Sequence, residues 1–286
     1  MTILDCGDKP LDLSQPRIMG VLNITPDSFS DGGNFLSAQS AYDHAMAMVE
    51  AGASIIDIGG ESTRPGAAEV SVDEELDRVI PVIEALRSVP AVISIDTSKP
   101  AVMSAAVSAG AGLLNDVRAL QEPGALEAVA GLRVPVCLMH MQGLPRTMQQ
   151  APHYDDVVEE VHDFLLQRVE SCVAAGIDRR RILVDPGFGF GKSLQHNLTL
   201  LAQLNRFTEM GLPLLVGMSR KSMLGTIVDK PVDERLYASL AVASLAAWQG
   251  ADIIRVHEVA ESVDVIKVVT AVMENRHNSQ NQRARE

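Results

Sequence analysis

The chain of 286 residues has few aromatic side chains and a deficit of positive charge. Trp, Tyr and Phe together make up 3% of it, and 24 basic residues face 37 acidic ones, which gives a formal net charge of -13. An acidic protein repels phosphate backbones, and single-stranded nucleic acids are held largely by stacking on aromatic rings. We therefore expect no nucleic-acid partner.

Long apolar runs and paired cysteines are also missing. No run reaches the roughly 18 apolar residues that a membrane-spanning helix needs, so we expect no membrane segment. The N-terminus, MTILDCGDKPLDLS, lacks the basic start and the apolar core of a secretory signal. Three cysteines (Cys6, Cys137 and Cys172) form no C-x-x-C pair, which argues against a disulfide framework and a zinc site. These features favour a reduced, cytoplasmic compartment.

The sequence does contain an alternation of short β-branched runs and longer helical patterns. The expected strands are Ile18–Leu22, Ile55–Ile58, Val92–Ile95, Leu113–Asn115, Val136–Met139, Ile182–Val184, Leu214–Val216 and Ile253–Val256. Eight strand–helix units without a break in composition predict an α/β fold, a single (β/α)8 TIM barrel, with an open doubly wound sheet as the alternative. We expect one domain over residues 1–286, with an N-terminal extension at 1–15 and a frayed tail at 277–286.

Two long connections follow the first two expected strands. They are 23–37 (NITPDSFSDGGNFLS) and 59–70 (GGESTRPGAAEV), both rich in Gly, Ser, Pro and Thr. Connections of this length in a compact barrel are usually either lids or disordered segments. Phe29, in the middle of the first, is an apolar group that water does not favour unless it folds over something. We expect two mobile loops that act as lids.

Polar side chains stand at the expected C-terminal end of every strand, where the active sites of such barrels lie. They are Asn23, Asp57, Asp96, Asn115, Asp116, His140, Asp185, Ser219, Arg220, Lys221, Arg255 and His257. Each also has a structural explanation: we favour helix capping for Asp57 and Asp116, and His140 alone is more typical of a buried structural histidine. Because a purely structural barrel needs no polar ends on all eight strands, we interpret the set as a functional site.

Three of these residues suit a flat heterocycle. Asp96 and Asp185 can each accept two parallel N–H bonds, and Asn115 both donates and accepts. Two acids in an apolar mouth would also favour positive charge that develops on the ring. A metal site is the rival interpretation, which Asn115 and the lack of a histidine on the same strands weaken.

The basic residues suit an anionic ligand. Arg255 and His257 are two positions apart in an extended strand, so both side chains point to the same face. Lys221 and Arg220 come from the neighbouring strand. Such a cluster of cations in an acidic chain predicts a phosphate-like ligand, since something must offset the repulsion. A salt-bridge network with neighbouring acids is the alternative for Arg255.

A glycine-rich stretch at Asp185–Ser193, DPGFGFGKS, resembles a phosphate-binding loop at first sight. The P-loop needs a glycine five positions before the glycine of its G-K pair, and here Pro186 stands there. The dinucleotide pattern G-x-G-x-x-G also fails, because Lys192 replaces its last glycine. We therefore reject a P-loop.

Eight motifs occur in the order MGVLNITPDSFSDGG, IDIGGESTRPG, IDTSKP, NDV, LMHMQG, DPGFGFGK, GMSRKS and RVHEV. Together they closely resemble the dihydropteroate synthase family of folate biosynthesis, over essentially residues 16–275. The resemblance implies a transferase that condenses 6-hydroxymethyl-7,8-dihydropterin diphosphate with 4-aminobenzoate, giving 7,8-dihydropteroate and pyrophosphate. It also implies Mg²⁺, a homodimer and inhibition by sulfonamides.

The resemblance assigns roles to individual residues. Those that match the pterin-holding positions are Asp96, Asn115, Asp185 and Lys221. Those that match the diphosphate end are Asn23, Thr63, Arg255 and His257, with Asn23 also matching a ligand of Mg²⁺. Those that match the aminobenzoate pocket are Phe29, Thr63, Pro65 and Ser222. Of these, the ones we expect to act in catalysis are Asp96, Asp185, Lys221 and Arg255.

Charge placement suggests the mechanism. Cations at the leaving pyrophosphate and carboxylates at the ring would stabilise separated charges, so we expect a dissociative, SN1-like displacement.

Two other functions remain open. A methyltransferase that binds methyltetrahydrofolate would need no diphosphate site, which Arg255 and His257 argue against. A non-catalytic pterin-binding module would need neither the loops nor the SRK triplet at 219–221.

Overall fold

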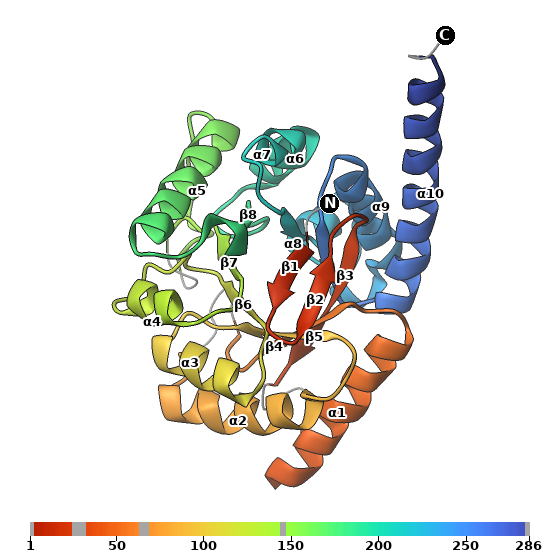
Figure 1. Cartoon of the computed structure of the whole chain (residues 1–286). Helices are drawn as coiled ribbons and strands as arrows, with labels where there is room; N and C mark the ends of the chain where they lie inside the picture. The colour runs from red at the N-terminus through yellow and green to blue at the C-terminus, as the bar shows by residue number, and fades with distance from the viewer. Residues whose placement is uncertain (1–2, 25–32, 63–68, 144–146, 284–286) are drawn as a thin grey trace.

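The computed structural model describes the backbone of residues 3–24, 33–62, 69–143 and 147–283. Side chains are described throughout these ranges except at 33–38 and 277–283. At the centre lies a sheet of eight parallel strands surrounded by helices, with the C-terminal helix running along one side (Figure 1). Among the described residues, no helix is both long and apolar enough to cross a membrane.

The sheet closes into a barrel. Its strands are β3 (Arg17–Asn23), β4 (Ile55–Gly59), β5 (Val92–Asp96), β6 (Leu113–Asp116), β7 (Val136–Met139), β8 (Ile182–Asp185), β9 (Leu215–Gly217) and β10 (Ile253–Val256). Seven parallel pairings join them in the order β8-β7-β6-β5-β4-β3-β10-β9. A parallel bridge between Val184 and Leu214 joins the two ends of this series. The closure confirms the (β/α)8 barrel and excludes the open doubly wound sheet.

Helices follow the strands as the alternating pattern predicts. They are α1 (Gly33–Glu50), α2 (Val72–Leu86), α3 (Pro100–Ala109), α4 (Ala125–Gly131), α5 (Val157–Ala174), α6 (Leu194–Ala202), α7 (Asn205–Thr208), α8 (Ser222–Val228), α9 (Leu236–Trp248) and α10 (Val259–Arg283). Local signals place their first residues: the Ser71 hydroxyl accepts a bond from the Glu74 amide at the start of α2, and Asp156 caps α5. Helix α1 begins at Gly33, so it includes the last five residues of the expected first loop, 33–37. The backbone of α10 continues as helix to Arg283, and fraying of 277–286 stays a prediction.

A hairpin that we did not expect closes the floor of the barrel. Strands β1 (Ile3–Cys6) and β2 (Lys9–Asp12) pair antiparallel within the segment predicted only as an extension. Their inward side chains pack with the first inward residue of the barrel strands in one cluster, which comprises Leu4, Cys6, Leu11, Leu13, Met19, Ile55, Val92, Leu113, Cys137, Leu183, Leu215 and Ile253. Four-residue strands carry too little periodicity to stand out from the sequence alone.

Candidate active site

Strand register brings the polar residues to the mouth of the barrel. Side chains alternate between the two faces of a strand, so a residue two or four positions after a floor residue also points inward. The inward pairs, floor residue first, are Ile55 and Asp57, Val92 and Asp96, Leu113 and Asn115, Leu183 and Asp185, and Ile253 and Arg255. The intervening residues Ile56, Leu114, Val184 and Ile254 instead pack against the helices. One apolar floor and one polar mouth therefore share the barrel interior.

Arg255 lies between two carboxylates of this mouth. Its Nε donates to Asp57 Oδ2 at 2.6 Å, and its Nη2 donates to Asp96 Oδ2 at 3.0 Å. The Asn115 amide donates to the same Asp57 oxygen at 3.0 Å. Asp57 is fully buried and Asn115 nearly so, whereas the Arg255 side chain keeps 22% of its surface exposed. Asp57 thus joins Asn115 to Arg255, and Arg255 joins both to Asp96.

Lys221 lies beside Asp185 on the other side of the mouth. It is the N-cap residue of α8, and its ammonium group donates to the Phe188 carbonyl and lies 4.6 Å from the centre of the Phe190 ring. Asp185 ends β8 and accepts a bond from the Gly187 amide at 2.7 Å. The structure therefore brings Asp185 and Lys221 together with the loop 186–191.

Burial sets the charge balance of the mouth. Burial raises the pKa of Asp96 to about 7, against the lowering effect of Arg255. Burial also raises the pKa of Asp185, against the lowering effect of Lys221. Burial lowers the pKa of Lys221 to about 8, although Asp185 raises it. Groups with pKa values near neutrality in a cleft are typical of functional sites.

A second polar cluster adjoins Arg255 on the loops after β9 and β10. Ser219 Oγ lies 2.9 Å from His257 Nδ1 and donates to Glu258 Oε2 at 3.1 Å, while Arg220 pairs with Glu258. Arg220 has a φ of +60°, a strained conformation for a side chain other than glycine, held by a bond from its amide to Ser239 Oγ at 3.0 Å. These bonds fix the backbone immediately before Lys221.

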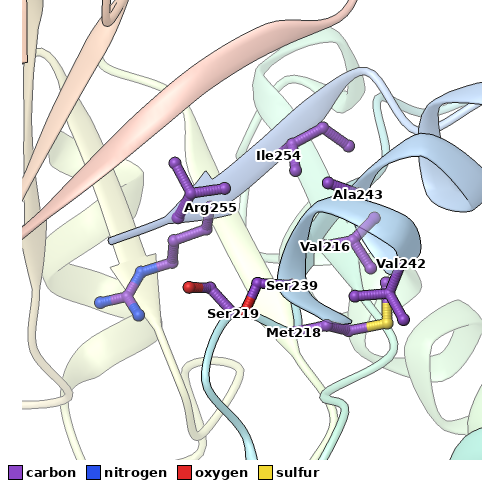
Figure 2. Close-up of a pocket in the computed structure, with 9 residues that line it drawn as sticks. Val216, Met218, Ser219, Ser239, Val242, Ala243, Ile254 and Arg255 are labelled. Atoms are coloured by element: carbon purple, nitrogen blue, oxygen red, sulfur yellow. The ribbon is translucent and has the colours of Figure 1, made fainter. Parts of the chain in front are cut away.

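The wall behind this cluster is tightly packed. Figure 2 shows Arg255 extending away from the apolar side chains of Val216, Val242 and Ala243 that fill the space between β9, β10 and α9. The cavity there measures about 10 Å³, room for one water at most. This wall therefore offers no room for a substrate.

The remaining expected residues differ in where they lie and in what they contact. Asn23 ends β3 at the rim and is partly exposed, and Ser222 is an exposed residue in the first turn of α8. Asp116 accepts bonds from the Arg118 and Leu120 amides, a structural role of the kind we favoured. Asp57, for which we favoured capping, instead bonds Arg255 and Asn115. Three residues assigned to the substrate pockets, Phe29, Thr63 and Pro65, lie outside the described residues.

Comparisons with known proteins agree with this geometry. The model of the pterin-binding enzyme family matches residues 19–257. The dihydropteroate synthase of Escherichia coli strain K12 is 58% identical over 269 residues, covering 94% of this chain and 95% of that protein. The chain belongs to the dihydropteroate synthase family.

Solved structures of dihydropteroate synthases superpose closely on the chain. That of Xanthomonas albilineans with 4-aminobenzoic acid has a TM-score of 0.91 and 53% identity, covering 96% of this chain and 99% of that one. A structure of the Xanthomonas albilineans synthase in complex with 7,8-dihydropteroate has a TM-score of 0.85 and 48% identity, with the same two coverages. The predicted family and fold are confirmed.

The sequence pattern suggested other roles for two residues of this site. Asp57 could have been recognised because it shares an inward face with Ile55, and a buried acid needs a charged partner. Lys192 is 3% exposed and stands next to the loop that contacts Lys221. No pattern in the sequence indicates that its side chain points inward, because a G-K pair is typical of a phosphate-binding loop.

Proposed function

We propose that this barrel mouth catalyses the dihydropteroate synthase reaction, the condensation of 6-hydroxymethyl-7,8-dihydropterin diphosphate with 4-aminobenzoate. The observation that carries the proposal is the convergence of Asp96, Asn115 and Asp185 with Lys221 and Arg255 in one mouth. The relatives that bind 4-aminobenzoic acid and 7,8-dihydropteroate support the choice of substrates.

The pterin ring would bind to the acids and the amide. Its amino and ring N–H groups are donors, which the carboxylates of Asp96 and Asp185 can accept, and Asn115 can serve both a donor and an acceptor. The bond from Asn115 to Asp57 orients that amide before the substrate arrives. Lys221 supplies a donor for a ring nitrogen or oxygen beside Asp185.

Displacement would proceed through separated charges. The C–O bond breaks with its electron pair leaving on pyrophosphate, and the pterin-methyl cation that remains faces the carboxylates of Asp96 and Asp185. Arg255 and His257 would hold the departing anion together with Asn23 and Thr63. The neutral amine of 4-aminobenzoate then forms the C–N bond and releases a proton to solvent or to pyrophosphate, so no dedicated base is required.

Mg²⁺ would enter with the diphosphate. Mg²⁺ prefers oxygen ligands and is commonly bound through one or two protein groups plus substrate phosphates. Asn23 fits this pattern, since its amide oxygen is partly exposed at the rim and makes no hydrogen bond to another described residue. When bound, the ion would neutralise charge that develops on the leaving group.

The loops 23–37 and 59–70 would complete the aminobenzoate pocket. Phe29, Thr63, Pro65 and Ser222 are the residues we assign to it, and Ser222 is the one among them that the structure describes, exposed beside Lys221. If the loops act as lids over bound diphosphate, the pocket exists only after the first substrate has bound. Competition by sulfonamides at this pocket is part of the same proposal.

A pyrophosphate-release assay tests the function. Release should require the pterin diphosphate and Mg²⁺, and 7,8-dihydropteroate should form when 4-aminobenzoate is added. Calorimetry should detect 4-aminobenzoate binding at least about tenfold more tightly with pyrophosphate and Mg²⁺ present than without them. Equal affinity in the empty protein would contradict the order, and absence of dihydropteroate would contradict the function.

We also propose that the chain acts as a homodimer in the cytoplasm. Large apolar side chains are exposed on neighbouring helices α8, α9 and α10, and comprise Ile227, Tyr237, Leu245, Trp248, Val268 and Val272. Helices α9 and α10 lie side by side (Figure 1). An extended apolar face of this kind indicates a protein partner, and a second copy of the chain can cover it symmetrically. The three free, buried cysteines suit a reducing compartment.

Light scattering after size-exclusion chromatography tests the dimer. The wild-type chain should elute at twice the mass of 30.7 kDa, and Leu245→Glu should shift it to the monomer by placing a charge in the apolar face. Val173→Glu is the matched control, because Val173 is similarly exposed but lies on α5. A monomeric wild-type chain, or a dimer that survives Leu245→Glu, would contradict the proposed surface.

A further inference from the structure

The loop between β8 and α6 is held from within by Lys192. Its ammonium group donates to the Gly187 carbonyl at 2.9 Å and to the Phe190 carbonyl at 3.1 Å, and its Nζ lies 2.8 Å from His140 Nδ1. An ammonium group has three N–H donors, and these three acceptors use all of them. Lys192 therefore points into the protein, where it cannot serve a phosphate at the surface.

Close packing fixes the same loop from outside. Gly187 and Gly191 have φ values of +70° and +63°, and a Cβ on either would overlap the carbonyl oxygen of His140 or of Gln142. Asn197 accepts a bond from the Gly189 amide at 2.7 Å. The glycine pattern that resembles a phosphate loop is thus explained by close approach of the backbone to the loop after β7.

Two residues of the proposed pterin site depend on this loop. The Gly187 amide donates to Asp185 Oδ1 at 2.7 Å, and the Phe188 carbonyl accepts a bond from Lys221. The Phe190 ring lies against the same ammonium group. Displacement of the loop would therefore move partners of both Asp185 and Lys221.

Lys192 also acts on the charges around it, although burial lowers its own pKa well below the ordinary value. The pKa of Asp185 is raised by burial and lowered by Lys221, the Gly187 amide, Lys192 and Arg255, in that order. On the adjacent strand β7, burial and nearby carboxylates keep Cys137 protonated by raising its pKa. Burial and Lys192 lower the pKa of His140 to about 2, so this imidazole is a neutral acceptor.

We propose that Lys192 is a positioning residue of the pterin site, which fixes the 186–191 loop against Asp185 and Lys221. The inference rests on the proposed function, because it assigns the pterin to these two residues. It goes further by giving the G-K pair of the motif a role that involves no phosphate.

Lys192→Met tests this role, because methionine keeps most of the length and removes the three donors and the charge. The affinity for a pterin probe, 6-hydroxymethylpterin followed by its fluorescence, should fall at least about tenfold at neutral pH. KM for the pterin diphosphate should rise more than KM for 4-aminobenzoate.

Lys9→Met is the matched control. Lys9 also donates to two backbone carbonyls, those of Arg87 at 2.9 Å and Ala91 at 3.1 Å, but it does so at the floor end of the barrel. This variant should change the melting temperature without weakening the binding of the pterin probe. A similar loss of probe affinity in both variants, or an affinity of Lys192→Met within twofold of the wild type, would overturn the proposal.

Lys192→Gln restores part of the bonding. Its amide can donate to one or two of the loop carbonyls, so it should recover part of the probe affinity that Lys192→Met loses. If Lys192→Met does not fold, the affinity of Lys192→Gln decides, and a wild-type affinity together with a lowered melting temperature would reject the positioning role. Probe binding is measured without turnover, so a wild-type chain that binds pterin but releases no pyrophosphate would reject the proposed function separately.

Discussion

Arg255→Met should destabilise the protein by about 3–5 kcal/mol at pH 8 and lower kcat/KM about 1000-fold. The guanidinium group bonds two carboxylates, those of Asp57 and Asp96, and methionine would leave both without their cation. Breaking a buried ion pair costs more than forming it contributed, because the remaining charge stays in a poorly solvated site. The activity loss follows from the removal of a cation that we place at the leaving diphosphate.

Lower pH should relieve part of the stability loss. The pKa of Asp96 is raised to about 7 by burial, against the lowering effect of Arg255, so it should rise further in the variant. An acid with a raised pKa in the folded state loses stability as the pH rises from its ordinary value, 3.8, through its folded value. Urea unfolding should therefore show a larger deficit at pH 8 than at pH 6.

A second substitution and a surface control make this test specific. Asp57→Asn in the Arg255→Met background should return about 1 kcal/mol or more, since it removes one of the unpaired buried charges. Arg206 also bonds two carboxylates, Glu159 and Glu209, but on the surface, so Arg206→Met should leave stability and activity nearly unchanged. Equal melting temperatures for the two arginine variants would contradict the account.

Lys221→Met should lower kcat/KM for the pterin diphosphate by about 100- to 1000-fold with little change in melting temperature. The ammonium group lies beside Asp185 and is bonded to the Phe188 carbonyl, so its loss removes a donor at the ring. Burial of this ammonium group costs desolvation energy in the folded state. Its removal relieves that cost, which offsets the loss of its favourable contacts. A stability loss comparable with that of Arg255→Met would indicate a structural role.

The pH dependence of the wild-type enzyme provides a second readout for Lys221. The profile of kcat/KM reports the pKa values of the free enzyme. It should fall below about pH 7, where Asp96 gains a proton, and above about pH 8, where Lys221 loses one. The alkaline limb should be absent in Lys221→Met and present in the control Lys230→Met, whose lysine is exposed beyond α8. An alkaline limb that persists in Lys221→Met would assign it to another group.

The barrel could be predicted because its strands are short apolar runs at regular intervals. All eight expected strands overlap an observed one, and their bounds differ by a residue or so at each end. The hairpin at 3–12 could not, since Lys9, Pro10 and the aspartates leave it no clear alternation. Its strands exist because the open end of a barrel exposes Met19, Ile55 and their neighbours, which is a tertiary reason absent from local sequence.

The site was predictable to the extent that strand ends determine position. Asp96, Asn115, Asp185 and Arg255 each end or nearly end a strand, and parallel strands place such ends together. Which of these side chains would bond to one another was not predictable, because that depends on which of them face each other across the barrel interior. The mouth is accordingly less divided into acidic and basic halves than expected, with Arg255 bonded to acids and Lys192 bonded to carbonyls of the 186–191 loop.

The closed floor determines how molecules pass through the barrel. Since the hairpin β1–β2 fills one end, reactants and products must use a single entrance. Asn115 and Asp185 lie deep, whereas Asn23 and Ser222 lie at the exposed rim. With the roles that we propose for these residues, the ring would enter first and the charged tail last. Spent pyrophosphate can then depart while the newly joined pteroate is still seated, and the deepest-bound portion of the product leaves at the end of each cycle.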